Sequence, residues 1–273
     1  MRVSCLPVSF FAQMLGGKMS VREWAHLAAR AGLDAIDLSG MMIANHTPVY
    51  LRKLKSDIES EGLPVVMIAT YPDFSHPDRM QRQRELDYLE CDIAAASFLE
   101  ARYVRIVAGQ AHPTTPLKQG VSWVLENFER AAETADKYGL QLVFENHSKP
   151  GAWDYVDFSH PTELFLEISE AIRDTAIGIH FDTANTLVYG DDALEVLEKV
   201  VASVVTIHAA DTAQRGRLEP VPLGQGIVPF KEIFQLLKRN NFDGWICIEE
   251  ASNTGETAVR RATDFVRETW EKA

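Results

Sequence analysis

The chain alternates short apolar runs with longer amphipathic stretches from one end to the other. This alternation is typical of repeated strand–helix units that build a parallel sheet. Eight runs bounded by Gly, Pro or polar residues predict strands at Val3–Phe10, Ala35–Leu38, Val65–Ala69, Tyr103–Val107, Leu142–Glu145, Ile177–Asp182, Val204–His208 and Ile246–Glu249. Eight such units in 273 residues predict a single (β/α)8 TIM barrel that spans residues 1–273 as one domain.

The segments between the predicted strands have the periodicity of helices that pack against a sheet. Apolar residues recur at helical spacing before the fourth and eighth strands, and these are predicted core positions: Leu86, Leu89, Ile93, Ala96 and Leu99, then Phe230, Ile233, Phe234 and Leu237. The start of one helix carries three arginines, which we interpret as a solvated face: Arg79, Arg82 and Arg84.

Four glycines stand just before predicted strands, where each preceding helix must end in a residue that tolerates positive φ: Gly32, Gly62, Gly139 and Gly244. A doubly wound open sheet is the competing architecture, and its nucleotide-binding version needs a glycine-rich turn after the first strand. Gly16 and Gly17 alone are a weak match to that motif. The Gly224-Gln225-Gly226 segment follows a long loop, and an ordinary turn is favoured there over a phosphate site.

Charge and cysteine content narrow the functional classes. The net charge of −12 would repel a phosphate backbone, which argues against a nucleic-acid partner. No apolar run approaches the roughly 18 residues of a membrane span. The three cysteines are widely separated and have no CxxC spacing, which favours a reducing cytoplasm over a disulfide framework. Homo-oligomer formation is left open.

Most histidines lie where a barrel would bring them together. Only His26 falls in a predicted helix, and the other seven lie at strand ends or on the loops that follow: His46, His76, His112, His147, His160, His180 and His208. The carboxyl ends of barrel strands converge on one mouth, so this distribution indicates metal or proton chemistry there. His180 is expected to share a strand face with Asp182, as a hydrogen-bonded barrel histidine rather than a catalytic one.

Four consecutive predicted strands, the fifth to the eighth, end in potential metal ligands. These are Glu145, Asp182, His208 and Glu249. Each carboxylate alone is more simply a helix cap or the partner of an arginine, but the set of four favours a metal site. Three carboxylates and one imidazole are hard ligands that favour one Mn²⁺, Mg²⁺ or Co²⁺ ion, with Zn²⁺ as an alternative. Such a site leaves coordination positions free for substrate oxygens.

The segments that carry these ligands also resemble a known family. Five of them are similar to motifs of the xylose isomerase-like sugar isomerase/epimerase superfamily: residues 142–147 (LVFENH), 180–185 (HFDTAN), 207–211 (IHAAD), 222–226 (PLGQG) and 246–250 (ICIEE). The resemblance covers essentially the whole chain. It implies a TIM barrel in which Glu145, Asp182, His208 and Glu249 bind the metal, while Glu145 and Glu249 also serve as catalytic acid and base.

Two positions depart from the family pattern. Many members have histidine three residues beyond the aspartate of the sixth strand, where this chain has Asn185. Asparagine is a poor metal ligand but can bind a sugar hydroxyl, so a trinuclear zinc nuclease site is disfavoured. The epimerases place an arginine about six residues beyond the seventh-strand histidine; Gln214 holds that spacing here, and Arg215 and Arg217 are the candidate substrate contacts.

Further candidate substrate contacts lie on the predicted loops at the barrel mouth. His112 follows the fourth strand, and His147 either contacts a substrate oxygen or orients Glu145. Asp211 either positions a ligand or binds substrate. Trp153 either stacks on the apolar face of a sugar ring or holds its loop in place.

These residues predict a metal-dependent isomerase or epimerase with a small carbohydrate substrate. Proton abstraction next to the carbonyl of a ketose or related hydroxy ketone would give a cis-enediolate. Two alternatives remain. One is a dehydratase of a keto-cyclitol or keto sugar, in which the same intermediate expels a β-hydroxyl group. The other is a barrel that only binds a ligand and has no catalytic activity.

Overall fold

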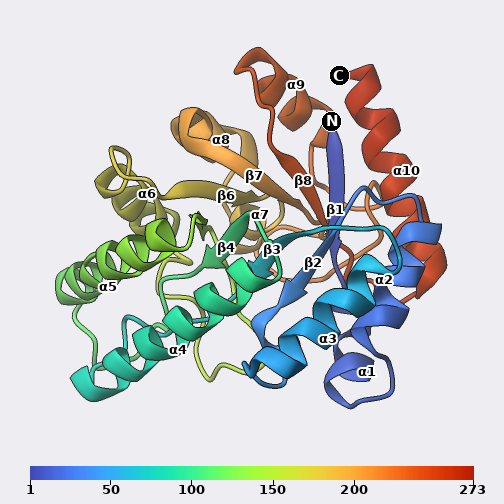
Figure 1. The fold of residues 1–273 in the computed structure, drawn as a ribbon. Helices are drawn as coiled ribbons and strands as arrows, with labels where there is room; N and C mark the ends of the chain where they lie inside the picture. Colours follow the sequence, from blue (N-terminus) through green and yellow to red (C-terminus); the bar gives the residue numbers. More distant parts are fainter.

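The computed structural model describes residues 1–273 as a barrel of parallel strands with helices around the outside (Figure 1). The eight strands are β1 (Arg2–Leu6), β2 (Ile36–Ser39), β3 (Val65–Ala69), β4 (Tyr103–Ile106), β5 (Gln141–Glu145), β6 (Gly178–Asp182), β7 (Val204–Ala209) and β8 (Trp245–Glu249). All eight predicted strands are therefore present, and the (β/α)8 fold is confirmed.

The sheet runs in the order β1-β8-β7-β6-β5-β4-β3-β2, and every ladder in it is parallel. The barrel is nearly closed between β1 and β2. These two strands lie side by side, and Ser4 Oγ of β1 donates a 2.6 Å hydrogen bond to Asp37 Oδ2 of β2. This order places β5, β6, β7 and β8 next to one another, so their carboxyl ends form one continuous part of the barrel mouth.

Ten α-helices and three short 3₁₀ helices connect the strands. The α-helices are α1 (Phe11–Leu15), α2 (Val21–Arg30), α3 (Pro48–Glu59), α4 (Arg79–Phe98), α5 (Leu117–Lys137), α6 (Thr162–Ala171), α7 (Asn185–Tyr189), α8 (Ala193–Val200), α9 (Phe230–Arg239) and α10 (Glu256–Lys272). The 3₁₀ helices are η1 (Val8–Phe10), η2 (Gly40–Met42) and η3 (Val201–Ser203). None of the helices combines the length and apolar character needed to cross a membrane.

The alternation of side chains along the strands decides which residues reach the site. Outward-facing residues such as Phe144 join a core of 64 buried side chains between the sheet and the helices. A smaller cluster of seven includes Val143 and Cys247, which lie two residues before Glu145 and Glu249 on the same strand faces. This second cluster fills the barrel beneath the site and separates the polar side chains above it from water on that side.

Three predictions about local structure were wrong. The first strand ends at Leu6, and Val8–Phe10 forms η1, with Pro7 as its N-cap residue. Arg82 is not on a solvated face, because it is buried with its guanidinium 3.7 Å from the centre of the Trp123 ring and its Nη1 bonded to the His76 carbonyl. Gly244 does not adopt positive φ; glycine is needed there because a Cβ atom would lie 1.9 Å from a backbone carbonyl oxygen.

Candidate functional site

The structure brings the four predicted metal ligands together at the carboxyl ends of β5 to β8. Glu145, Asp182, His208 and Glu249 each end or nearly end a strand, and one ligand atom from each lies within 4.8 Å of the others. The ladder pairs Asp182 with His208 and places both on the inner face of the barrel. Spacing of this kind allows all four side chains to contact one ion.

Hydrogen bonds fix the orientation of these side chains. His208 Nδ1 lies 2.6 Å from Glu145 Oε1 and 3.0 Å from Glu249 Oε2, so a single ring nitrogen faces two carboxylates. Asp182 Oδ1 accepts the backbone N–H groups of Ala184 and Asn185 at 2.8 and 2.7 Å, which leaves Oδ2 available as a ligand. The ring nitrogen, the glutamates and the free aspartate oxygen therefore converge on one point.

The charge balance of the cluster favours a cation. Burial and the nearby carboxylates of Glu249 and Glu145 raise the pKa of Asp182 well above its usual range. Burial lowers the pKa of His208, but the same two glutamates outweigh burial and raise it well above its usual value. A protein that gathers three carboxylates in a dry site needs positive charge there, and a divalent ion would supply it. The donor set thus fits the expected metal.

Arg105 is a site residue that the sequence did not single out. Its Nε lies 3.1 Å from Glu145 Oε2, both side chains are fully buried, and its guanidinium lies 4.4 Å from the centre of the Tyr71 ring. Burial alone raises the pKa of Glu145, but the charges of Arg105 and His208 outweigh it and hold that pKa well below its usual range. The only signal in the sequence was a charged residue inside the apolar run of the fourth strand.

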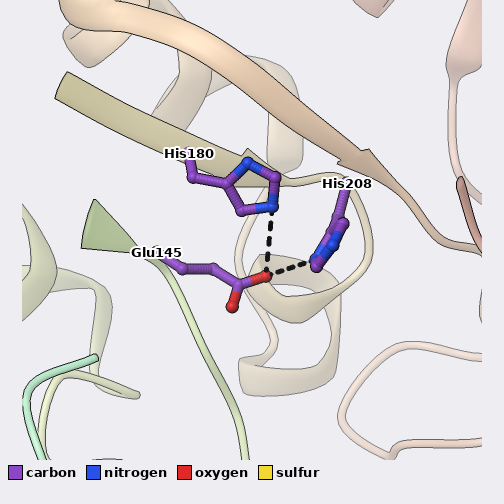
Figure 2. A group of neighbouring side chains, drawn as sticks. All are labelled: Glu145, His180 and His208. Carbon is purple, nitrogen blue, oxygen red and sulfur yellow. Dashed lines mark hydrogen bonds and ion pairs between the residues drawn. The ribbon is translucent and has the colours of Figure 1, made fainter. Parts of the chain in front are cut away.

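His180 lies next to Glu145 and His208, and one of its ring nitrogens faces the Glu145 carboxylate (Figure 2). Its Nδ1 lies 2.6 Å from Thr206 Oγ1, and its Nε2 lies 3.7 Å from Glu145 Oε1. The rings of His180 and His208 meet edge to face with their centroids 4.1 Å apart. His180 thus backs the cluster from within the barrel wall, and its strand face is the one expected from the sequence.

A cavity of about 370 Å³ opens onto the cluster. One wall is apolar and the floor carries polar residues: Leu6, Val8, Phe11, Leu15, Leu218, Pro220 and Val221 on the wall, and Arg105, His147, Asp182, Asn185 and Glu249 near the floor. The two glutamates differ in access, because the Glu249 side chain is 29% exposed whereas Glu145 is fully buried. A small polar ligand in this cavity would therefore meet Glu249 directly.

Two predicted substrate contacts, His147 and Asn185, line this cavity. His147 Nδ1 is buried without a hydrogen bond and lies 3.8 Å from Asp157 Oδ2, which also lacks one. Burial lowers the pKa of His147 to about 4, so its ring is neutral at physiological pH. No hydrogen bond joins His147 to Glu145, so the geometry favours a substrate contact over an orienting role.

Asp211 lines the cavity but mainly organises the loop that follows β7. Its carboxylate accepts the N–H groups of Thr212, Gly224, Gly226 and Val228. A Cβ atom on Gly226 would lie 2.2 Å from Asp211 Oδ1, which explains the need for glycine in that turn. The N–H groups that a phosphate would use are thus occupied by Asp211, in agreement with an ordinary turn.

The remaining predicted contacts lie outside this cavity. Arg215 is half exposed, and its guanidinium reaches the Gly190 carbonyl and Asp192; Arg217 is exposed on the same loop. His112 Nε2 lies 2.7 Å from Asp73 Oδ2. Trp153 lines a neighbouring cavity, with its ring against that of His147.

The sequence of the chain is similar to those of known proteins. The sequence profile of the xylose isomerase-like TIM barrel family matches residues 25–269. A Streptomyces coelicolor protein named as a candidate hydroxypyruvate isomerase is 28% identical over 239 residues, which cover 81% of this chain and 82% of that protein. An inosose dehydratase from Geobacillus thermodenitrificans is 22% identical over 290 residues, covering 93% of this chain and 91% of the enzyme.

Solved structures share the fold at low sequence identity. D-psicose 3-epimerase with D-tagatose, from Clostridium cellulolyticum, superposes with a TM-score of 0.80 at 13% identity and covers 99% of both chains. The IolI protein with a bound zinc atom has a TM-score of 0.81 at 16% identity, covering 100% of this chain and 99% of that one. A probable 3-DHS dehydratase from Bacillus anthracis reaches 0.78 at 16% identity, covering 98% and 99%.

Proposed function

Because the chain belongs to the xylose isomerase-like TIM barrel family, we propose that it is a divalent-metal-dependent isomerase or epimerase of a small carbohydrate. Its substrate carries a hydroxyl group next to a ketone. The observation that carries the proposal is the placement of Glu145 and Glu249 on strands that flank those of Asp182 and His208, with Asp182 and Glu249 lining one cavity. The isomerase and epimerase names of several relatives and structural neighbours are consistent with it.

Glu145, Asp182, His208 and Glu249 would hold the metal. When bound, a divalent ion supplies stabilisation for the negative charge that develops on substrate oxygens after proton loss. Arg105 compensates one negative charge of the ligand set and fixes the Glu145 carboxylate from behind. His147 and Asn185 would bind substrate hydroxyl groups, since both line the cavity.

Glu249 is proposed to take the first proton, because its carboxylate is the one that faces the cavity. It would remove hydrogen from the carbon next to the carbonyl and leave an enediolate. Glu145, on the other side of the ligand pair, would take up a proton from water and deliver it to the opposite face of that carbon to give the epimer, while Glu249 would release the proton that it removed to solvent. Return of the proton to the neighbouring carbon would instead exchange the carbonyl and hydroxyl positions, as an isomerase does.

Dehydration is the second candidate function. His147 places a neutral imidazole at the cavity beside Glu249, where its ring N–H can donate a hydrogen bond to a departing hydroxyl group. A hydroxyl group on the next carbon would leave as water if a proton reached it before the enediolate was reprotonated. Several relatives are named as inosose dehydratases, and one structural neighbour as a probable 3-DHS dehydratase.

Incubation with ketoses and keto-cyclitols in D₂O distinguishes these functions. The protein is loaded with Mn²⁺, the ion is removed by a chelator after the reaction, and products are analysed by NMR and mass spectrometry. An isomerase or epimerase gives a deuterated isomer of unchanged carbon skeleton, whereas a dehydratase gives an enone and water. Absence of deuterium uptake and of product from every compound would count against both functions and favour a barrel that only binds ligand.

A further inference from the structure

A second cavity of about 270 Å³ adjoins the one above the metal ligands. The two share four lining residues: Met41, Tyr71, Pro150 and Ala152. The second cavity lies between the loops that follow β2 and β3, the middle of α4 and the loop that follows β5. A ligand bound in the cavity beside the candidate metal ligands could therefore extend past Tyr71 into the second cavity.

The lining of the second cavity has the chemistry of a sugar-binding site. Trp153 and Tyr88 offer aromatic rings, and the Tyr88 ring is well exposed. Two carboxylates, Glu85 and Asp92, offer hydrogen-bond acceptors. Asp92 Oδ1 lies 3.1 Å from His46 Nε2, while its Oδ2 has no hydrogen-bond partner. Aromatic faces that pack on C–H groups, together with acceptors for hydroxyl groups, suit a sugar ring.

The charge of this lining excludes other extensions of the substrate. No lysine or arginine lines the second cavity, whereas two carboxylates do. A phosphate or carboxylate group placed there would be repelled and would find no cationic partner. A purely apolar group would bury Asp92 Oδ2 without a partner, which costs free energy. The group that fits is neutral and rich in hydroxyl groups.

We propose that the second cavity is a subsite for a glycosyl group, so that the substrate is a keto sugar carrying a second sugar ring rather than a free monosaccharide. This inference rests on the proposed function for the position of the keto sugar itself. Trp153 then stacks on the second ring and Asp92 accepts one of its hydroxyl groups. The assignment also explains why Trp153 lies outside the cavity that contains the metal ligands.

Titration calorimetry on the Mn²⁺-loaded protein tests the subsite. The probes are fructose, fructose 6-phosphate and the glucosyl-fructose disaccharides turanose, maltulose, leucrose and isomaltulose, in which glucose is attached through different fructose hydroxyls. At least one disaccharide should bind about tenfold more tightly than fructose, the gain expected from one stacking contact and one hydrogen bond. Trp153→Ala and Asp92→Asn should each bring the ratio of the two affinities back toward one.

Tyr155→Ala is the matched control, because Tyr155 is an exposed aromatic on the same loop that lines neither cavity. It should keep the disaccharide-to-fructose ratio of the wild type. The subsite is overturned if no disaccharide binds more tightly than fructose, if both Trp153→Ala and Asp92→Asn keep the gain, or if only fructose 6-phosphate gains affinity. Deuterium uptake is measured in parallel: binding gain without uptake would refute the proposed function alone, and uptake without gain would refute the subsite alone.

Discussion

Arg105 and Glu145 form a buried ion pair directly behind the candidate metal ligands. The arginine also donates Nη1 to the Thr70 carbonyl at 2.8 Å and faces the Tyr71 ring, so its position is fixed on several sides. A carboxylate in such a dry environment stays ionised only with a positive partner. Arg105 therefore keeps the Glu145 carboxylate ionised and fixed in position, as a metal ligand must be.

Replacing Arg105 by methionine, which keeps much of its length, should strongly destabilise the protein. Glu145 would be left buried without its charge partner, and loss of one member of a buried pair typically costs about 3–5 kcal/mol. Urea unfolding measures the change. Arg102→Met is the control, because Arg102 is exposed just before the same strand, and it should cost less than about 1 kcal/mol. Equal losses in the two variants would refute the role given to Arg105.

The buried carboxylate of Asp37 in β2 should make the stability of the protein depend on pH. Burial raises its pKa to about 6, although Ser4 donates a hydrogen bond to it. In the unfolded chain the pKa of Asp37 is about 3.9, so between that pH and about 6 the folded protein binds more protons than the unfolded chain. The free energy of unfolding therefore falls as pH rises through this window. Asp37→Asn should remove the cost, making the variant roughly 2 kcal/mol more stable than the wild type at pH 8. The difference should vanish near pH 4, and a pH-independent difference in urea unfolding would contradict this account.

At the scale of elements, the Asp211 carboxylate ties together the two ends of the loop between β7 and α9. It accepts the backbone N–H groups of Thr212, Gly224, Gly226 and Val228, while hydrogen bonds from Thr212 and the loop backbone hold the stretch that contains Leu218, Pro220 and Val221, the apolar wall of the cavity. The four N–H groups surround the Asp211 carboxylate in the way that backbone amides surround a bound anion. Such a device orders a long loop without regular secondary structure.

Asp211→Ala should therefore loosen this loop while leaving the barrel folded. Hydrogen exchange followed by mass spectrometry should show faster exchange across residues 212–228 and little change in the strands, because the four N–H groups lose their acceptor. Asp78→Ala is the control, since Asp78 is the N-cap residue of α4 and its side chain accepts only the Met80 N–H, away from this loop. Unchanged exchange in the Asp211 variant would show that the loop is held by other contacts.

The strands and helices were largely predictable from the sequence, because the spacing of apolar residues distinguishes strands from helices and Gly or Pro residues mark where these elements end. The boundary at η1 was missed because apolar residues continue past Pro7 where the backbone already turns. The clustering of the four candidate ligands was predictable because each ends or nearly ends a strand. Arg105 and Asp157 were not, because their importance depends on which strand and loop lie beside them, and no local pattern contains that information.

At the scale of the whole molecule, the barrel holds a concentrated negative charge at one end of its axis. Three carboxylates meet in a site whose surroundings are buried, and Arg105 supplies the only adjacent guanidinium. The 64-residue core around the barrel keeps these groups in place. The fold can therefore exist without an ion, and an ion should add stability by relieving repulsion between the carboxylates.

Metal binding should raise the melting temperature, and the gain in stability should grow with the logarithm of the ratio of free ion concentration to Kd. At a free ion concentration of about 100 times Kd, the gain is roughly 2.7 kcal/mol, and EDTA should reverse it. Metal analysis is expected to give one ion per chain, since Asn185 stands where a second ion would need histidine. His208→Ala should abolish the shift, whereas His26→Ala, at an exposed position of α2, should keep it. Two or three tightly bound zinc ions per chain would contradict a single site.

Deuterium exchange in Glu249→Gln tests whether Glu249 moves a proton next to the carbonyl of a substrate held at the metal site. The variant keeps the shape of the side chain but removes the base, and its metal occupancy is matched to that of the wild type by analysis of the same sample. Hydrogen exchange between substrate and D₂O should fall about 10²- to 10⁴-fold. Exchange at the wild-type rate with full metal occupancy would show that Glu249 is not the proton-transfer group.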